Sequence, residues 1–132
     1  MLKALNPTTI RPPFAKYSHG IEAPPGCSLV TLSGQLGVTA DDLAPDGARE
    51  QAEVCFANID AILQDAGMTR ASVMRINAYV TDRTHMPGYM AARDQWIERL
   101  DPPPASTLMI VSGFTRPEFK VEIEVLAARW PD

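Results

Sequence analysis

The chain has 132 residues, of which 45% are hydrophobic and 21% charged, and a net charge of −4. This is the composition of one globular domain, 1–132, that buries a core without disulfides or metals. The acidic charge offers no field for a phosphate backbone, so we expect no nucleic-acid binding. The longest apolar run, 108–111, is too short to cross a bilayer, and the first residues lack a signal-peptide core. We therefore expect a cytoplasmic protein without membrane contacts.

The cysteines and histidines do not form a site in the sequence. Cys27 and Cys55 have neither metal-ligand spacing nor a secretory signal, so we expect free thiols. His19 and His85 lie far apart without a CxxC or HxxxH pattern, and no metal site is expected. Cys55 belongs to a helical apolar stripe, which predicts a core thiol.

Apolar spacing and turn signals predict six elements in the order strand, helix, strand, helix, strand, strand. In chain order they are strand 27–38, helix 48–66, strand 72–82, helix 87–100, and strands 107–112 and 120–129. The first helix is the clearest, because Gly67 supplies a C-terminal stop. Strand 72–82 alternates between two faces, with Met74, Ile76, Ala78 and Val80 on one and Arg75, Asn77 and Tyr79 on the other.

This order of elements predicts a single sheet with both helices on one face, because crossover connections are right-handed. Residues 107–111 are nevertheless apolar at positions that point to both faces, so the uncovered face also needs a cover. A second copy of the chain is the expected cover, which predicts a homo-oligomer. The alternative is a monomer whose N-terminal segment folds over the sheet.

Two carboxylates interrupt the last predicted strand. Glu122 and Glu124 lie among apolar residues, and side chains two residues apart point to the same face, about 7 Å from each other. One interpretation is a half-exposed edge strand with a polar face. The other is a carboxylate that lines a wet pocket at a subunit interface and orients water or relays a proton. The residues alone leave both open.

Five segments together carry a family resemblance. They are "KYSHGI" (16–21), "LSGQLGV" (32–38), "NIDAILQDAGM" (58–68), "INAYVTD" (76–82), and "PAST" (104–107) followed by "VEIEV" (121–125). In this order and spacing the chain resembles the reactive intermediate deaminase family, RidA, also called YjgF or L-PSP. The resemblance implies a chorismate-mutase-like α+β fold, assembled as a homotrimer with three clefts between subunits.

The resemblance also implies an activity and its residues. Active members hydrolyse enamines and imines, such as 2-aminoacrylate, to a 2-oxo acid and ammonia without a cofactor. Tyr17 matches the family's pocket tyrosine, and Ser33 and Gly34 match the backbone that contacts the ligand. Glu122 matches the glutamate that positions water, whereas Glu124 is expected to be structural.

One position departs from the family pattern in a way that bears on substrate binding. Active members carry Pro-Ala-Arg-Ser, whose arginine binds the substrate carboxylate, whereas this chain has Ser106 there, followed by Thr107. A serine donates one neutral hydrogen bond in place of two charge-assisted ones, which weakens carboxylate binding by about 10- to 100-fold. Met90 and Arg93 also stand where the family commonly has Asn and Tyr.

Three hypotheses remain open. The protein hydrolyses imines with an altered substrate range, with Glu122 placing water and Ser106 and Thr107 donating hydrogen bonds. Alternatively, Arg93 or Arg116 replaces the missing arginine. In the third hypothesis the trimer is not an enzyme and binds a small metabolite in its clefts. Ribonuclease activity is disfavoured, because the chain is acidic and lacks a His or Lys pair suited to RNA cleavage.

Overall fold

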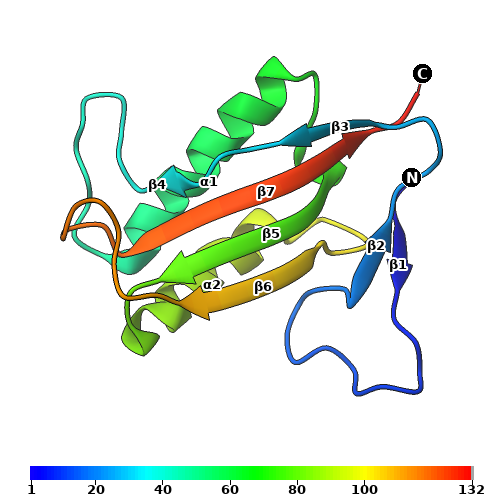
Figure 1. Cartoon of the computed structure of the whole chain (residues 1–132), viewed down its shortest axis with the longest axis horizontal. Helices are drawn as coiled ribbons and strands as arrows, with labels where there is room; N and C mark the ends of the chain where they lie inside the picture. The colour runs from blue at the N-terminus through cyan, green and yellow to red at the C-terminus, as the bar shows by residue number, and fades with distance from the viewer. Residues whose placement is uncertain (132) are drawn as a thin grey trace.

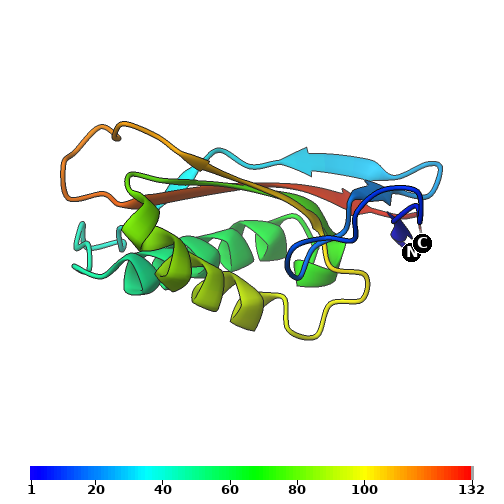
Figure 2. The same ribbon diagram turned by 90° about the horizontal axis from the view of Figure 1, so that it is seen from below.

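Two helices pack against one face of a mixed β-sheet and leave the other face open (Figures 1 and 2). The structure is a computed structural model that describes residues 1–131. The strands of the sheet are β3 (Ser28–Thr31), β4 (Gln35–Leu36), β5 (Val73–Val80), β6 (Ala105–Ile110) and β7 (Val121–Arg129). The helices are α1 (Ala48–Asp65) and α2 (Met86–Trp96), with the short 3-10 turns η1 (Arg70–Ser72) and η2 (Arg83–His85). A separate ribbon consists of β1 (Lys3–Leu5) and β2 (Gly20–Glu22).

The strand order is β3-β7-β5-β6, and β4 also pairs with β7. Strand β5 runs parallel to β6 and antiparallel to β7, which is antiparallel to β3 and β4. Parallel neighbours need a crossover, and α2 supplies it between β5 and β6. Figure 2 shows both helices on the same side of the sheet. The predicted mixed sheet with two helices on one face is therefore confirmed.

The long strand β7 alternates between the two faces. Its buried side chains join the core beneath the helices: Val121, Ile123, Val125 and Ala127. Its half-buried side chains lie on the open face: Glu122, Glu124 and Leu126. In the same core Phe56 of α1 stacks on Trp96 of α2, with ring centroids 4.7 Å apart. Burying each large apolar side chain of this kind contributes roughly 1.5–3 kcal/mol.

Cys55 lies in this core and is fully buried, which confirms the predicted core thiol. Burial raises the pKa of its thiol to about 12, so the sulfur stays protonated at neutral pH. Helix α1 ends at Asp65, and the predicted stop signal Gly67 follows it with a positive φ of 69°, which allows Met68 to donate a hydrogen bond back to the Leu63 carbonyl. None of the described helices is both long and apolar enough to cross a membrane.

The expected strand 27–38 is divided into β3 and β4. Thr31 pairs with Leu126 and Gln35 with Ile123, so the N-terminal strand has one more residue between these pairs than β7 has. The extra residue is accommodated at 32–34, where the pairing is interrupted. The apolar pattern continues through this break because Leu32 is still buried.

Strand β5 contains a second irregularity. Val73 pairs with Ala127 and Arg75 pairs with Leu126, so Met74 is an extra residue in the strand. The bulge places Val73 in the core beside Ile76, although their spacing does not fit a regular strand. The prediction that Met74 shares the buried face is wrong, because the bulge removes it from the alternation.

Other boundaries also differ from the predictions. Helix α2 ends at Trp96 rather than near residue 100, and β6 spans Ala105–Ile110 rather than 107–112. The earlier start of β6 reflects its parallel register, in which Ala105 already pairs with Arg75. The pairing of β1 with β2 was not predicted, because each strand is only three residues long.

A buried glutamine ties α1 to two loops at one end of the sheet. The Gln51 side-chain amide donates hydrogen bonds to the Pro45 carbonyl at 2.8 Å and the Glu118 carbonyl at 2.9 Å. Its oxygen accepts a hydrogen bond from the Lys120 amide at 2.8 Å. One side chain therefore satisfies three backbone groups next to the start of β7.

Gln51→Leu should lower the free energy of unfolding by roughly 2–3 kcal/mol, because it leaves these three backbone groups without partners. Urea unfolding followed by circular dichroism measures the change. Gln64→Leu is the matched control, since Gln64 is exposed on the same helix and should change the stability little. Equal effects of the two substitutions would contradict the role of Gln51.

Candidate functional site

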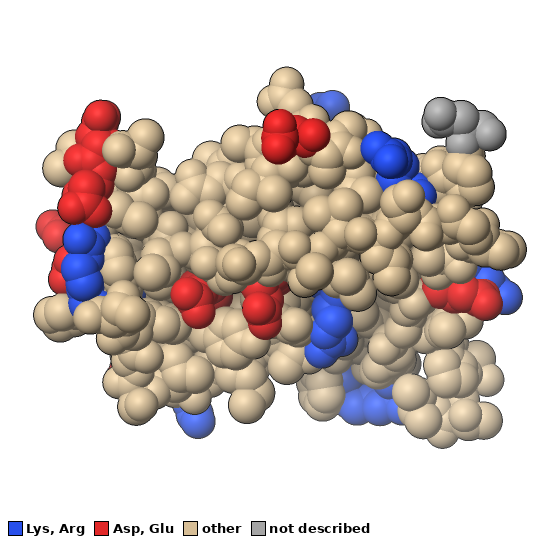
Figure 3. Space-filling model, turned by 45° about the horizontal axis from the view of Figure 1, so that its top comes forward, with Lys and Arg blue, Asp and Glu red and all other residues tan. Residues whose placement is uncertain are grey.

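A network of polar side chains crosses the open face of the sheet. Glu124 of β7 accepts a hydrogen bond from the Tyr79 hydroxyl at 2.6 Å and one from the Asn77 amide at 3.5 Å. Arg75 donates to the Asn77 side-chain oxygen at 2.8 Å and to the Thr107 hydroxyl at 2.5 Å. The network joins three strands, and it satisfies Glu124 as expected for a structural carboxylate. Figure 3 shows acidic and basic side chains close together on a surface that is otherwise mostly uncharged.

Glu122 lies on the same face but outside this network. It is half-buried, and its side chain makes no hydrogen bond with any residue in 1–131. Burial, and then the nearby Glu124 carboxylate, raise the pKa of Glu122 above its ordinary value. The carboxylate therefore holds protons more readily than an exposed glutamate, and its oxygens are available to water or a ligand.

Gly34 covers Glu122. A Cβ atom at position 34 would lie 2.6 Å from Cδ of Glu122, so only glycine allows this approach. The neighbouring Ser33 is exposed, and its carbonyl accepts a hydrogen bond from the Gln35 side chain at 3.1 Å. The structure thus brings together three predicted site residues, Ser33, Gly34 and Glu122, next to the β4 edge of the sheet.

Tyr17 lies at the opposite edge, near the start of β6. Its neighbour Ser18 is buried, bridges to Ala105, and donates from its hydroxyl to the Pro103 carbonyl at 2.6 Å. The Tyr17 hydroxyl accepts a hydrogen bond from the Phe14 amide at 3.1 Å, which leaves the phenolic proton free for donation. The N-terminal segment thereby places the tyrosine beside the PAST segment.

Ser106 and Thr107 point to opposite faces of the sheet. Ser106 pairs with the core residue Ile76, whereas Thr107 pairs with Asn77 of the open face. Within one chain the two hydroxyls therefore point away from each other, and their donation to a ligand stays a prediction. Thr107 belongs to the polar network, and Ser106 faces α2.

Arg93 and Tyr89 of α2 lie next to Ser106. Arg93 is only 3% exposed, and its guanidinium contacts the Asp94 carboxylate at 2.9 Å. Burial raises the pKa of Tyr89 to about 12, while Arg93 and Ser106 act in the opposite direction. The Tyr89 hydroxyl has no partner of ordinary hydrogen-bond geometry in the described chain. An arginine, a serine and an unsatisfied phenol therefore meet where the family arginine was expected.

Arg116 does not reach this place. It lies in the loop beyond the other end of β6, where its guanidinium is 3.2 Å from Asp42 and 2.9 Å from Glu118. The two carboxylates hold it, so Arg116 is a poor replacement for the missing arginine. Of the two predicted cations, only Arg93 lies beside Ser106.

An apolar groove lies between α2 and the edge strand β6, with a volume of about 700 Å³. We call it the α2–β6 groove, and its lining residues are Arg83, Met86, Pro87, Met90, Leu108, Met109 and Ile110. Met109 and Ile110 are 52% and 45% exposed, so nothing within residues 1–131 covers this edge. The expectation that this strand is buried on both faces is not met within one chain.

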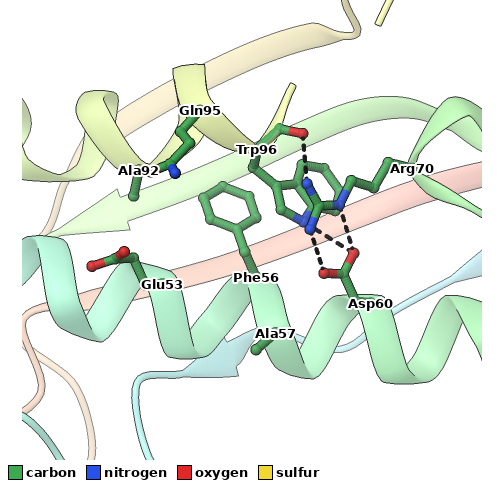
Figure 4. A pocket seen from close by; sticks show the side chains of 8 residues that line it. All are labelled: Glu53, Phe56, Ala57, Asp60, Arg70, Ala92, Gln95 and Trp96. Carbon is green, nitrogen blue, oxygen red and sulfur yellow. Dashed lines mark hydrogen bonds and ion pairs between the residues drawn. The ribbon is translucent and has the colours of Figure 1, made fainter. Parts of the chain in front are cut away.

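A second hollow, on the helical face, has a structural explanation (Figure 4). Its floor is the stacked pair Phe56 and Trp96, which is almost completely buried. Its one ion pair joins Arg70 to Asp60 at 2.8 Å, and the Trp96 indole also donates to Asp60 at 3.0 Å. Arg70, Asp60 and Trp96 therefore satisfy one another's hydrogen-bonding groups and link η1 to both helices.

The predicted site residues therefore form two groups. Tyr17, Ser106 and Arg93 lie at the β6 edge, whereas Glu122 lies with Ser33 and Gly34 toward the β4 edge. In the described part of the chain, no group of three His, Cys, Asp or Glu side chains is arranged to hold a metal ion. Sequence reasoning did not identify Arg75, Tyr89 or Arg83 as residues of a site. Strand alternation indicates the face on which Arg75 lies, whereas the positions of Tyr89 and Arg83 depend on how α2 packs.

The fold is a mixed sheet with two helices on one face. Together with the sequence motifs, this fold defines the class of protein. The family described as Endoribonuclease L-PSP matches residues 8–129. The chain belongs to this family, which is also known as the RidA or YjgF family.

Individual relatives agree with this assignment. A crystal structure of a protein of unknown function, the Rid family member YyfB from Yersinia pestis, has a TM-score of 0.85 and 28% identity, covering 97% of this chain and 98% of that one. A RutC family protein of Aquifex aeolicus (strain VF5) is 26% identical over 89% of this chain and 91% of its own. A Dermatophagoides farinae protein named 2-iminobutanoate/2-iminopropanoate deaminase is 24% identical over 85% and 84% of the two chains.

Glu122→Gln should make the fold as stable or more stable at neutral pH. A raised pKa means that the folded state binds protons more tightly than the unfolded state, so ionised Glu122 opposes folding above its folded-state pKa. The difference from the unmodified protein should shrink as the pH falls through that pKa. Urea unfolding between about pH 4 and pH 8 measures it, with the exposed Glu53→Gln as control. A clear loss of stability at pH 7 would be inconsistent with this account.

Gly34→Ala should displace Glu122 while leaving the fold intact, because the methyl group collides with a flexible side chain rather than with backbone. The carboxylate then moves toward solvent, and its pKa falls toward the ordinary value. NMR titration of the glutamate side-chain carboxyl carbons measures this shift. Ser33→Ala, at an exposed neighbouring position, should leave it unchanged; an unchanged pKa in Gly34→Ala would refute the contact.

Proposed function

We propose that this protein hydrolyses reactive enamines and imines to a carbonyl product and ammonia, with a substrate range altered by Ser106. The observation that carries the proposal is Glu122, a half-buried carboxylate with a raised pKa and no hydrogen-bond partner among residues 1–131. Such a group is suited to accept and return protons. The deaminase name of one relative supports the same reaction.

The site is completed in a homotrimer. The two groups of site residues lie toward opposite edges of one sheet, near β6 and near β4. A head-to-tail contact joins opposite edges of successive copies, and such contacts form a closed ring when the rotation permits. The ring places Tyr17, Ser106 and Arg93 of one copy against Glu122 of the next. It also covers the exposed residues Met109 and Ile110. The cytoplasmic location stays a prediction.

The chemistry needs one water molecule and no cofactor. The substrate reacts as the protonated imine: water adds to the imine carbon, Glu122 takes one proton of the water, and the C=N electron pair moves to the nitrogen, which gives a neutral carbinolamine. Glu122 returns this proton to the nitrogen, then takes the hydroxyl proton as the carbonyl forms, and the C–N bond breaks to release ammonia. Tyr17 donates its free phenolic proton as a hydrogen bond to the substrate, and Gly34 keeps Glu122 in place.

The second candidate is a trimer that binds a small metabolite without turnover. It is favoured by the state of the carboxylate-binding position, where Ser106 offers one neutral hydroxyl and Arg93 is already paired with Asp94. In this case Glu122 holds a ligand rather than a reacting water. The two candidates differ in turnover alone.

Imines generated in situ by an amino-acid oxidase test both candidates. We expect the unmodified protein to accelerate hydrolysis and Glu122→Gln to lower the rate by about 100-fold or more. Ser106→Arg should improve turnover of imines that carry a carboxylate, by about 10- to 100-fold. Turnover by Ser106→Arg alone would favour the binding protein, and turnover by neither would refute the hydrolase.

A further inference from the structure

The two glutamates of β7 have different surroundings although they share one face of the sheet. Glu122 and Glu124 lie two residues apart, about 7 Å from each other along the strand. Glu124 accepts hydrogen bonds from the Tyr79 hydroxyl at 2.6 Å and from the Asn77 amide at 3.5 Å. Glu122 accepts none from any side chain in 1–131. The donors therefore hold one carboxylate of the pair in place and leave the other free to exchange protons.

Tyr79 determines which of the two carboxylates is held. Tyr79 lies directly opposite Glu122 in the pairing of β5 with β7. Its hydroxyl nevertheless donates to Glu124, the diagonal neighbour, which a long aromatic side chain can reach. That hydrogen bond also raises the pKa of Tyr79, so the phenol stays neutral. A phenol has one proton to donate, so Glu122 receives no hydrogen bond from the residue that it faces.

Arg75 and Thr107 support the same arrangement from the neighbouring strands. The Arg75 guanidinium donates to the Asn77 side-chain oxygen at 2.8 Å, so the Asn77 amide nitrogen is directed toward Glu124. Thr107 of β6 accepts a second hydrogen bond from Arg75 at 2.5 Å. The position of Glu124 is thus fixed by hydrogen bonds from β5 and, through Arg75, from β6.

The other groups around Glu122 are neutral or directed elsewhere. Its partner on β4 is Leu36, and the Cys55 thiol on the helical side stays protonated at neutral pH. Lys120 lies two residues earlier on the same face but donates from its amine to a loop carbonyl. Within residues 1–131, the charge that acts on Glu122 is therefore the Glu124 carboxylate.

We propose that Tyr79 and Glu124 are positioning residues for Glu122: Tyr79 holds the Glu124 carboxylate in place, and its fixed negative charge makes Glu122 a stronger base. A like charge nearby favours the protonated form of Glu122, so Glu122 takes a proton from water more readily. The inference rests on the proposed function where it makes Glu122 the base of the hydrolysis. The effect of the two residues on Glu122 can be measured without any substrate.

NMR titration of the glutamate side-chain carboxyl carbons tests the pair without turnover. Glu124→Gln keeps an oxygen that accepts from Tyr79 but removes the charge, so the midpoint of the Glu122 titration should move to lower pH. Tyr79→Phe should broaden the Glu122 titration, because Glu124 without its donor competes for the same proton. Thr107→Val breaks the network at its far end and should leave the Glu122 titration unchanged. Glu53→Gln, at an exposed position on α1, controls for the loss of one negative charge.

The rate of imine hydrolysis as a function of pH tests the role of the pair in catalysis. When Glu122 is the base, kcat/KM decreases as the pH falls below the pKa of Glu122. We expect this acidic limb to move to lower pH in Glu124→Gln, together with the NMR midpoint. In both Glu124→Gln and Tyr79→Phe, kcat at neutral pH should fall by about two- to tenfold with little change in KM, because Glu122 becomes a weaker base.

An unchanged Glu122 midpoint in Glu124→Gln would overturn the inference. A Thr107→Val variant that broadens the titration as Tyr79→Phe does would also overturn it, because the network would then only support the sheet. Altered titrations in a protein without turnover would support the pair and refute the hydrolase. An acidic limb that stays in place while the NMR midpoint moves would overturn the role of the pair in catalysis and leave the hydrolase standing.

Discussion

The alternation of β7 is the constraint on which the rest of the structure depends. A strand turns successive side chains to opposite faces, so one strand can supply Ile123 to the core and Glu122 to the open face. A slip of one residue in its register would bury both carboxylates under the helices, which is far more costly than leaving apolar groups half-exposed. The pairing of β7 with three other strands therefore fixes the core and the candidate site together.

This arrangement also explains why a single chain carries only parts of a site. The helices occupy one face, the polar network occupies the middle of the other, and the remaining groups lie at the two edges. Edge strands expose unpaired backbone groups, and β6 adds Met109 and Ile110 to that exposure. A surface of this kind is suited to contact with another chain.

Sequence reasoning was most successful where the signal is local. Helix α1 and its stop at Gly67 follow from spacing and from one residue type, and the order of elements was enough to place both helices on one face. The bulge at Met74 was missed because it arises from mismatched lengths between paired strands. The alternation of side chains along a strand could have predicted the opposite directions of Ser106 and Thr107. The burial of Arg93 could not be predicted in this way, because it depends on the packing of α2 against β6.

The bulge at Met74 has a consequence for how the family can vary in length. On either side of it the strand already alternates correctly, since Val73 faces the core and Arg75 faces the open side. Loss of the bulged residue would join two segments that are in phase, and every other side chain would keep its face. Loss of a residue within the regular segment 76–80 would instead invert one part of the strand relative to the rest. The bulge is thus the place in β5 where a residue can be lost without moving core side chains to the open face.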